Sequence, residues 1–386
     1  MGRASGSSSR SVRGNDETKQ QMTNFDDDMT DNNSHAENLL DLNEVMQAFG
    51  ISTWKNLGPL ETPNANFLSV LVEINGQNYV LRERPDGPIG EDIHFRYDFQ
   101  QYLQQSGIPV PSFLRTSQGE PTVKLGEDFF EIQQQIGGEL FSTSNPRSLD
   151  WTTSAGNMLG RIHQASQRYT GTLHPWPAEA QIGSVVQGYL NIARSRANQD
   201  ALQAISSALS EWADQWQAVL PSAMMSIGAH HALPEFHIHG DYHALNLRFG
   251  PFGVSAVTGL EAARWEKRIF EVAYALFYFG GLAWLPGSTT TPPLVKRGFE
   301  PERVRSFLHG YNEQCPPVKG EAALLVDALT LISPIVTLNG PLEDLFYRDE
   351  EAEGVVIDDM LERLAWATAL PAWLGRVRRS FAEMWD

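Results

Sequence analysis

Asp241 and Asn246 stand five positions apart, and Gly240 directly precedes the aspartate. In phosphoryl transfer, an aspartate accepts the proton of the attacking hydroxyl group and an asparagine oxygen at this spacing holds a magnesium ion. The same two residue types also make simple hydrogen bonds within turns. The pair therefore indicates phosphoryl transfer as one chemistry for this segment and a plain loop as its alternative.

Histidine supplies a second hypothesis, because five of the 10 histidines lie in one short segment. His237, His239 and His243, together with Asp241, come within one residue of the H-x-H-x-D-H pattern of zinc hydrolases, and imidazole is the commonest zinc ligand. However, Gly240 interrupts the alternation that would place these side chains on one face of a strand. We therefore favour the interpretation that His239 and His243 orient the loop through hydrogen bonds, with His237 on a strand face.

The elements that must hold this loop in place are mostly helical in pattern. Residues 236–257 are expected to form a loop flanked by short strands, and helical periodicity dominates from Asp150 onward. Residues 201–220 predict an amphipathic helix, whose apolar stripe includes Trp212 and Trp216. Residues 321–385 also predict helix, with breaks expected at Pro334, Pro341 and Pro371.

The region upstream of residue 140 is rich in strand patterns. Asn75-Gly76-Gln77 is a hairpin turn signal between two alternating segments. Strands are expected over residues 68–74, 78–84, 113–116, 122–125 and 129–135, and a helix over residues 91–105. This order predicts a small sheet with one helix packed on it.

The composition limits the partners of the chain. It has 386 residues, a net charge of -18 and a pI near 5.0. This acidity argues against nucleic acid and against an anionic membrane surface, because both attract clustered basic residues. The single cysteine, Cys315, excludes a disulfide framework and a Cys-rich zinc site, and it favours a cytoplasmic protein. The longest apolar stretch, residues 272–286, is shorter than the roughly 20 residues of a membrane-spanning helix.

The N-terminal segment differs from the rest of the chain. Residues 1–36 are polar, with too few apolar side chains to offset the entropy of ordering, and are expected to form a disordered tail. Arg3, Arg10 and Arg13 among serines leave a transit peptide as a minor alternative. A short helix is expected over residues 39–49.

The segment His239-Gly240-Asp241, followed by His243 and Asn246, resembles a known catalytic loop. Its pattern, H-G-D-x-H-x-x-N, is that of the aminoglycoside phosphotransferase and choline kinase-like family, which includes stress-response kinase members. Three further segments are similar to landmarks of the same family, at residues 79–82, 107–111 and 159–163. The resemblance covers roughly residues 45 to 386.

This resemblance implies an α+β, protein kinase-like bilobal fold. The small lobe, over residues 37–138, would be an antiparallel β-sheet with one helix and would bind the nucleotide. The larger, mainly helical lobe, over residues 139–386, would carry the catalytic loop and the acceptor site. ATP would lie between the lobes together with Mg2+.

The resemblance also implies roles for residues of the catalytic loop. Asp241 would be the proton acceptor, with His239 and His243 as its catalytic neighbours. Asn246 would be a metal ligand.

On the nucleotide side, the resemblance implies that Arg82 contacts phosphate, as a rigid cationic fork in place of the more usual lysine. The loop over residues 61–67 would cover the phosphates, although it lacks glycine. The adenine would lie against residues 133–138, with Gln133 and Gln135 as nucleotide-binding residues.

One departure from the family pattern concerns the metal. The family places its main metal-binding aspartate on the strand after the catalytic loop, where this chain has Gly259. Magnesium is usually held by one or two carboxylates, so this loss should impair catalysis. Glu261 survives at the second acidic position and is the candidate replacement ligand. If it fills that role, Glu261→Gln should abolish magnesium-dependent turnover and Gly259→Asp should raise it.

Other departures concern two ion pairs. Arg96 falls near the place where the family has the glutamate that pairs with the strand base, and Asp92 or Asp98 would have to substitute for it. Further on, Glu271 stands where the family has an aspartate at the start of a helix. That change keeps the charge.

The sequence therefore predicts a cytoplasmic, ATP-dependent phosphotransferase that acts on a hydroxyl of a small metabolite or on Ser/Thr. The alternative is a pseudokinase-like protein that binds ligand without transferring phosphate, because of Gly259. The acidic run at residues 349–353 would suit a cationic acceptor, and the tryptophans would suit a stacking pocket. A solvated loop and ordinary core packing are the simpler explanations of those two features.

Overall fold

The computed structural model describes residues 42–60, 68–84, 91–126, 128–171, 173, 182–197, 203–281, 300–337 and 354–386. They belong to two structural units, Met1–Ser52 and Thr53–Asp386. In the first unit the described helix is α1 (Leu42–Ala48), which lies within the segment where a helix was expected. The predicted disordered tail, residues 1–36, lies outside the described residues.

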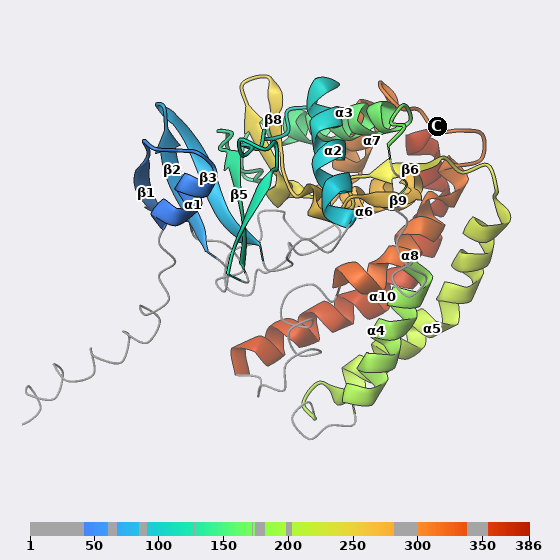
Figure 1. The fold of residues 1–386 in the computed structure, drawn as a ribbon. Helices are drawn as coiled ribbons and strands as arrows, with labels where there is room; N and C mark the ends of the chain where they lie inside the picture. The colour runs from blue at the N-terminus through green and yellow to red at the C-terminus, as the bar shows by residue number, and fades with distance from the viewer. Residues whose placement is uncertain are drawn as a thin grey trace, which may run out of the picture. The chain divides into compact units, whose positions relative to one another are not determined.

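A five-stranded antiparallel sheet opens the second unit, in the order β1-β2-β3-β5-β4 (Figure 1). Its strands are β1 (Lys55–Pro59), β2 (Ser69–Ile74), β3 (Gln77–Arg84), β4 (Thr122–Leu125) and β5 (Asp128–Gln134). The expected hairpin joins β2 to β3, because Asn75 and Gly76 adopt φ angles of 53° and 76°, as a tight two-residue turn requires. Arg82 lies opposite Ser69 in this hairpin.

Two details of the sheet differ from the prediction. The strand expected at residues 113–116 is wrong, since only Phe113 forms an isolated bridge, to Gln133, before the chain turns at Gly119. Strand β1 was not predicted, because Lys55–Pro59 lacks alternation and contains both glycine and proline. It is an exposed edge strand with a bulge at Gly58, where such residues are tolerated.

The helix α2 (Glu91–Gln105) forms where it was expected and ends before Gly107. The longer helices that follow are α3 (Ser148–Ser166), α4 (Ile182–Arg196), α5 (Ser206–Ala229), α6 (Arg268–Phe279), α7 (Pro301–Asn312), α8 (Leu325–Thr337) and α10 (Gly354–Trp385). Between α5 and α6, β6 (Glu235–Ile238) pairs with β9 (Arg264–Lys267), and β7 (Leu247–Gly250) pairs with β8 (Gly253–Val257). The short 3-10 turns are η4 (Ala244–Asn246), η5 (Leu260–Ala262) and η6 (Ala322–Leu324).

Two of the helix breaks predicted at prolines are wrong. Pro334 lies inside α8 and Pro371 inside α10, while Pro341 lies outside the described residues. Similarly, α5 continues through Pro221, beyond the predicted end. An interior proline costs a helix about 3 kcal/mol, so these helices persist because their apolar faces are buried in the core. None of the helices that the structure describes is long and apolar enough to cross a lipid bilayer.

The helices α3 and α7 cross with their backbones in direct contact. A Cβ atom at Gly156 of α3 would collide with the carbonyl oxygen of Phe307, and one at Gly310 of α7 with that of Thr153. Only hydrogen atoms fit at this crossing. The close approach brings His163, near the end of α3, to Tyr311 of α7, where the imidazole Nδ1 and the phenol oxygen are 2.7 Å apart.

Candidate active site

The loop that carries Asp241 connects β6 to η4. Strand β9, the partner of β6, follows after β7, β8 and η5. Strand β6 places His237 opposite Trp265 of β9 and ends at Ile238. Gly240 then turns the chain with a φ of 87°, and a Cβ atom there would collide with the carbonyl oxygen of Ala262. The close approach of these two segments therefore depends on a glycine at position 240.

Three side chains hold the Asp241 carboxylate. The Tyr274 hydroxyl of α6 donates to Oδ1 at 2.7 Å. The Asn246 amide donates to Oδ2 at 2.9 Å and to the Asp241 carbonyl oxygen at 2.8 Å. The Nε2 atom of His243 lies 3.2 Å from Oδ2. The sequence spacing of Asp241 and Asn246 thus corresponds to direct contact, while Tyr274 was missed because its helix gave no chemical signal.

These contacts keep Asp241 ionised. Burial alone would raise the pKa of the carboxyl group, but its contacts with His243 and the hydrogen bond from Tyr274 outweigh burial and hold the pKa well below its usual range. Burial in turn raises the pKa of the Tyr274 phenol, so this group stays protonated and can donate. About 38% of the Asp241 side chain remains exposed, so the carboxylate is accessible.

The two histidines of the loop act through hydrogen bonds. The Asp241 amide donates to His239 Nδ1 at 3.2 Å, and His239 Nε2 lies 2.8 Å from the Thr258 carbonyl oxygen. The Leu245 amide donates to His243 Nδ1 at 3.1 Å, so Nε2 carries the ring proton that faces Asp241. His239 is fully buried and therefore positions the loop from within.

Glu271, at the start of α6, anchors the loop backbone. Its carboxylate accepts hydrogen bonds from the amides of His239, at 3.0 Å, and Gly240, at 2.5 Å. It also accepts one from His163 Nε2 at 2.7 Å, with almost no exposure of either side chain. Burial alone would raise the pKa of Glu271, but the His163 contact holds it below its usual value. The glutamate noted in the sequence therefore fixes the turn before Asp241.

A side chain at position 259 would require the Asn246 side chain to move. Gly259 adopts a φ of 82°, and a Cβ atom there would lie 2.6 Å from Asn246 Cγ and 2.8 Å from its Oδ1. The Asn246 carboxamide occupies the space that a side chain at 259 would enter. That Gly259→Asp raises activity stays a prediction, and in that variant the Asn246 carboxamide would have to move.

Glu261 is found beside Arg82. Its carboxylate lies 3.6 Å from Arg82 Nη1, with 44% and 36% of the two side chains exposed. Glu261 is thus an acid beside Arg82 that was not among the candidates Asp92 and Asp98, and the side chain of Asp92 lies outside the described residues. The helix α2 is tied to the sheet differently: Tyr97 donates to Glu131 Oε2 at 2.7 Å, and Arg84 donates to the same oxygen at 2.8 Å.

Asn246 and Glu261 stay predicted magnesium ligands, beside a position 259 that supplies no carboxylate. Asn246 donates to Asp241 from its amide nitrogen, and the Glu261 carboxylate lies 3.6 Å from Arg82 Nη1. In the described parts of the chain, no three His, Cys, Asp or Glu side chains are grouped to hold a metal ion. The zinc hypothesis finds no support there, and His237 packs against Phe95 with ring centroids 4.7 Å apart.

The glutamines expected at the nucleotide site differ in exposure. Gln133 is buried on β5 and donates to Glu131 Oε1 at 2.6 Å. Gln135 is exposed just after β5, and its backbone N–H donates to the Asn78 carbonyl oxygen at 3.0 Å. Gln133 thus supports the sheet, whereas the side chain of Gln135 is accessible. The loop expected over the phosphates, residues 61–67, lies outside the described residues.

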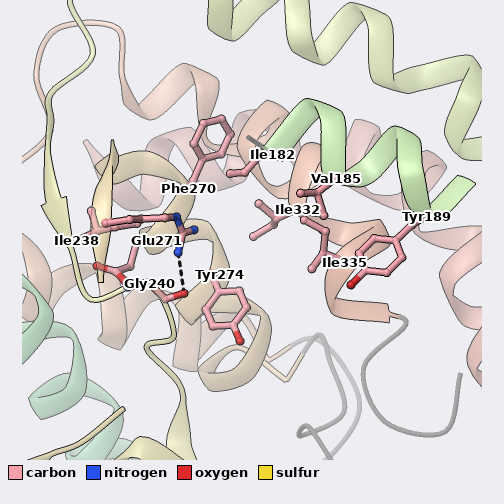
Figure 2. A pocket seen from close by; sticks show the side chains of 11 residues that line it. Ile182, Val185, Tyr189, Ile238, Gly240, Phe270, Glu271, Tyr274, Ile332 and Ile335 are labelled. Atoms are coloured by element: carbon pink, nitrogen blue, oxygen red, sulfur yellow. Dashed lines mark hydrogen bonds between the residues drawn. The ribbon is translucent and has the colours of Figure 1, made fainter. Parts of the chain in front are cut away.

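A cavity of about 220 Å³ adjoins the Asp241 loop (Figure 2). Tyr274 and Gly240 lie at the end of this cavity nearest the loop, and side chains of α4 and α8 form the other end. Asp241 itself is not among the lining residues, but Tyr274, which is, donates to its carboxylate.

Comparison with known proteins decides the family. A model described as the phosphotransferase enzyme family matches residues 62–317. The chain belongs to this family. Homoserine kinase of Pseudomonas aeruginosa is 26% identical over 189 residues, which are 49% of this chain and 53% of that protein. The chain thus matches only about half the length of this curated relative.

Solved structures of the phosphotransferase family share the fold. A microcompartment-associated aminopropanol kinase superposes with a TM-score of 0.59 and 15% identity, covering 88% of this chain and 98% of the other. Spectinomycin phosphotransferase, solved with ADP and spectinomycin, gives a TM-score of 0.55 and 14% identity, covering 89% and 97%. The α+β kinase-like fold expected from the sequence is confirmed.

Proposed function

We propose that this chain transfers a phosphoryl group from ATP to a hydroxyl group of a small molecule, with Asp241 as the proton acceptor. The observation that carries the proposal is the ionised Asp241 carboxylate, held by Tyr274, Asn246 and His243 beside a cavity. Membership of the phosphotransferase family and the ADP-bound relative support ATP as the donor. The cavity of about 220 Å³ favours a small molecule over a Ser/Thr side chain of a protein.

In this proposal, Asp241 accepts a hydrogen bond from the acceptor hydroxyl group. This hydrogen bond directs the hydroxyl oxygen of the acceptor toward the γ-phosphorus of ATP. A bond forms between that oxygen and phosphorus, the bond to the leaving ADP oxygen breaks, and the proton passes to Asp241. The low pKa makes Asp241 a weak base, so it acts mainly by orienting the hydroxyl group until the transfer is far advanced. Arg82 and Gln135 are the proposed nucleotide contacts. The division at residues 37–138 and 139–386 and the cytoplasmic location stay predictions.

Replacing the carboxylate tests this role. Asp241→Asn should lower turnover by about 10²- to 10⁴-fold, the usual contribution of a positioned base, with little change in ATP affinity. Acceptor-dependent ADP release and an ATP titration would measure the two quantities. Asp214→Asn is the matched control, because Asp214 is an exposed aspartate on α5. Full activity of Asp241→Asn would refute the assignment.

A second candidate is favoured by the packing of Asn246 against Gly259. This packing leaves no carboxylate for magnesium at 259, so the chain would bind nucleotide without transferring phosphate. A ligand that binds only the folded chain raises the melting temperature. A shift with ATP that requires magnesium supports the enzyme. A shift that is indifferent to magnesium, without turnover on any acceptor, supports the binding protein.

A further inference from the structure

The cavity beside Asp241 is small and largely apolar. Its volume is about 220 Å³. Ile182 and Val185 of α4 face Ile332 and Ile335 of α8, and Phe270 of α6 lies beside them (Figure 2). Such walls stabilise a hydrocarbon group by about 25 cal/mol for each Å² removed from water.

The charged groups in the wall do not suit a cation. Arg264 lines the cavity and directs its guanidinium at the carbonyl oxygens of Gly240, at 3.2 Å, and Ala262, at 3.3 Å. The acid in the described wall is Glu271, which is only 2% exposed. Both of its oxygens already accept hydrogen bonds, from His163 and from two backbone amides. An ammonium group in the cavity would lose water and face Arg264 and, with Asp241 engaged by the acceptor hydroxyl group, would find no acid with a free oxygen in the described lining.

We propose that the acceptor is a small, predominantly apolar alcohol that carries no positive charge. Its hydrocarbon part lies between α4, α6 and α8, and its hydroxyl group reaches Asp241 past Tyr274. This inference rests on the proposed function. It separates this chain from the aminopropanol kinase, whose named substrate is an amino alcohol. The reaction forms a bond from the alcohol oxygen to the γ-phosphorus, breaks the bond to ADP and passes the hydroxyl proton to Asp241.

Two probes of equal shape test the proposal. In 3,3-dimethylbutan-1-ol a carbon atom stands where choline has its quaternary nitrogen, so the pair differs in charge and not in size. Both are assayed with the full chain for phosphorylated product and, separately, for binding by ligand-observed NMR. The neutral alcohol should bind and be phosphorylated with a kcat/KM at least about tenfold above that of choline, a difference of about 1.4 kcal/mol.

Each outcome bears on one claim. Equal or better use of choline would overturn the inference, as would a failure of the neutral alcohol to bind. Preferential binding of the neutral alcohol without phosphorylation would support the cavity assignment and count against the proposed phosphotransferase activity. The binding readout therefore separates the two failures.

An added charge in the wall gives a second test. Val185→Glu should move the ratio of choline to neutral alcohol toward choline by about tenfold, because the new carboxylate supplies a counter-charge. Ser184→Glu is the matched control, since Ser184 is the exposed neighbour in the same turn of α4. A folded Val185→Glu protein, judged by circular dichroism, with an unchanged ratio would overturn the proposal. If that variant does not fold, the wild-type comparison still decides.

Discussion

The segments on the two sides of Asn246 differ sharply in how they are equipped. On the Asp241 side, three side chains hold one carboxylate, and Glu271 fixes the backbone that precedes it. On the Gly259 side, no side chain is present, and one added there would meet the Asn246 carboxamide. In the proposed function, the first side orients the acceptor hydroxyl group, whereas the second lacks the carboxylate that the family resemblance implies for the metal. The proposed positioning of the hydroxyl group and the predicted binding of magnesium therefore depend on different sides of Asn246.

The largest effect is expected at the anchor on the Asp241 side. Glu271→Ala would leave two buried amides and His163 without an acceptor, which should lower the free energy of unfolding by about 3 kcal/mol and abolish turnover. Urea unfolding measures the loss, and the exposed Glu302→Ala of α7 is the control. A loss below about 1 kcal/mol would show that the loop does not depend on this anchor.

A smaller effect is expected on the Gly259 side. Gly259→Ala should cost about 1 to 2 kcal/mol for its left-handed backbone and, by displacing Asn246 from Asp241, should lower turnover about tenfold or more. Gly119→Ala is a matched control, because Gly119 has a φ of 87° and nothing within 4 Å of its Cβ position. If both variants keep full turnover, the contact between Asn246 and position 259 has no catalytic importance.

Lowering the pH should reduce the free energy of unfolding moderately, because it acts on His163 and Glu271. Burial lowers the pKa of His163 from its usual 6.5, and this outweighs Glu271, which would raise it. The pKa of Glu271 is itself held below its usual 4.5. The unfolded chain therefore binds a proton at His163 as the pH falls below about 6.5 while the folded chain does not, and stability is lost. The same occurs at Glu271 below about 4.5.

Unfolding in urea at about pH 7 and pH 5 should reveal this loss, on the order of 1 kcal/mol from His163. His163→Gln removes the titrating group and should flatten the dependence, whereas replacing the exposed His309 should not. An equal slope in wild type and His163→Gln would count against a proton-free His163 in the folded chain.

The smallest effect is expected for the ion pair of Arg82 and Glu261. Both side chains are more than a third exposed and 3.6 Å apart, so a double-mutant cycle should give a coupling below about 0.5 kcal/mol. Glu261→Gln should therefore leave stability unchanged, and it should preserve the melting shift caused by ATP with magnesium. Loss of that shift would instead identify Glu261 as a metal ligand that replaces the carboxylate missing at position 259.

Much of this arrangement could be predicted from the sequence, because local patterns carry local structure. The Asn-Gly turn predicted the β2–β3 hairpin, and the spacing of Asp241 and Asn246 predicted a pair that lies in contact. Tyr274 and the Arg82–Glu261 pair could not be predicted, since both join segments far apart in the chain. The helices through Pro334 and Pro371 were missed because burial of their apolar faces outweighs a local cost.

The distance between α3 and α7 at their crossing determines how precisely the proposed active site is positioned. Gly156 and Gly310 face the opposite backbone with only hydrogen atoms between them, so a single methyl group at either position would push the two helices apart. That displacement would move Tyr311 away from His163, and His163 supports the glutamate that holds the turn before Asp241. The orientation of the Asp241 carboxylate thus depends on glycine at positions 156 and 310, both of which lie at the helix crossing.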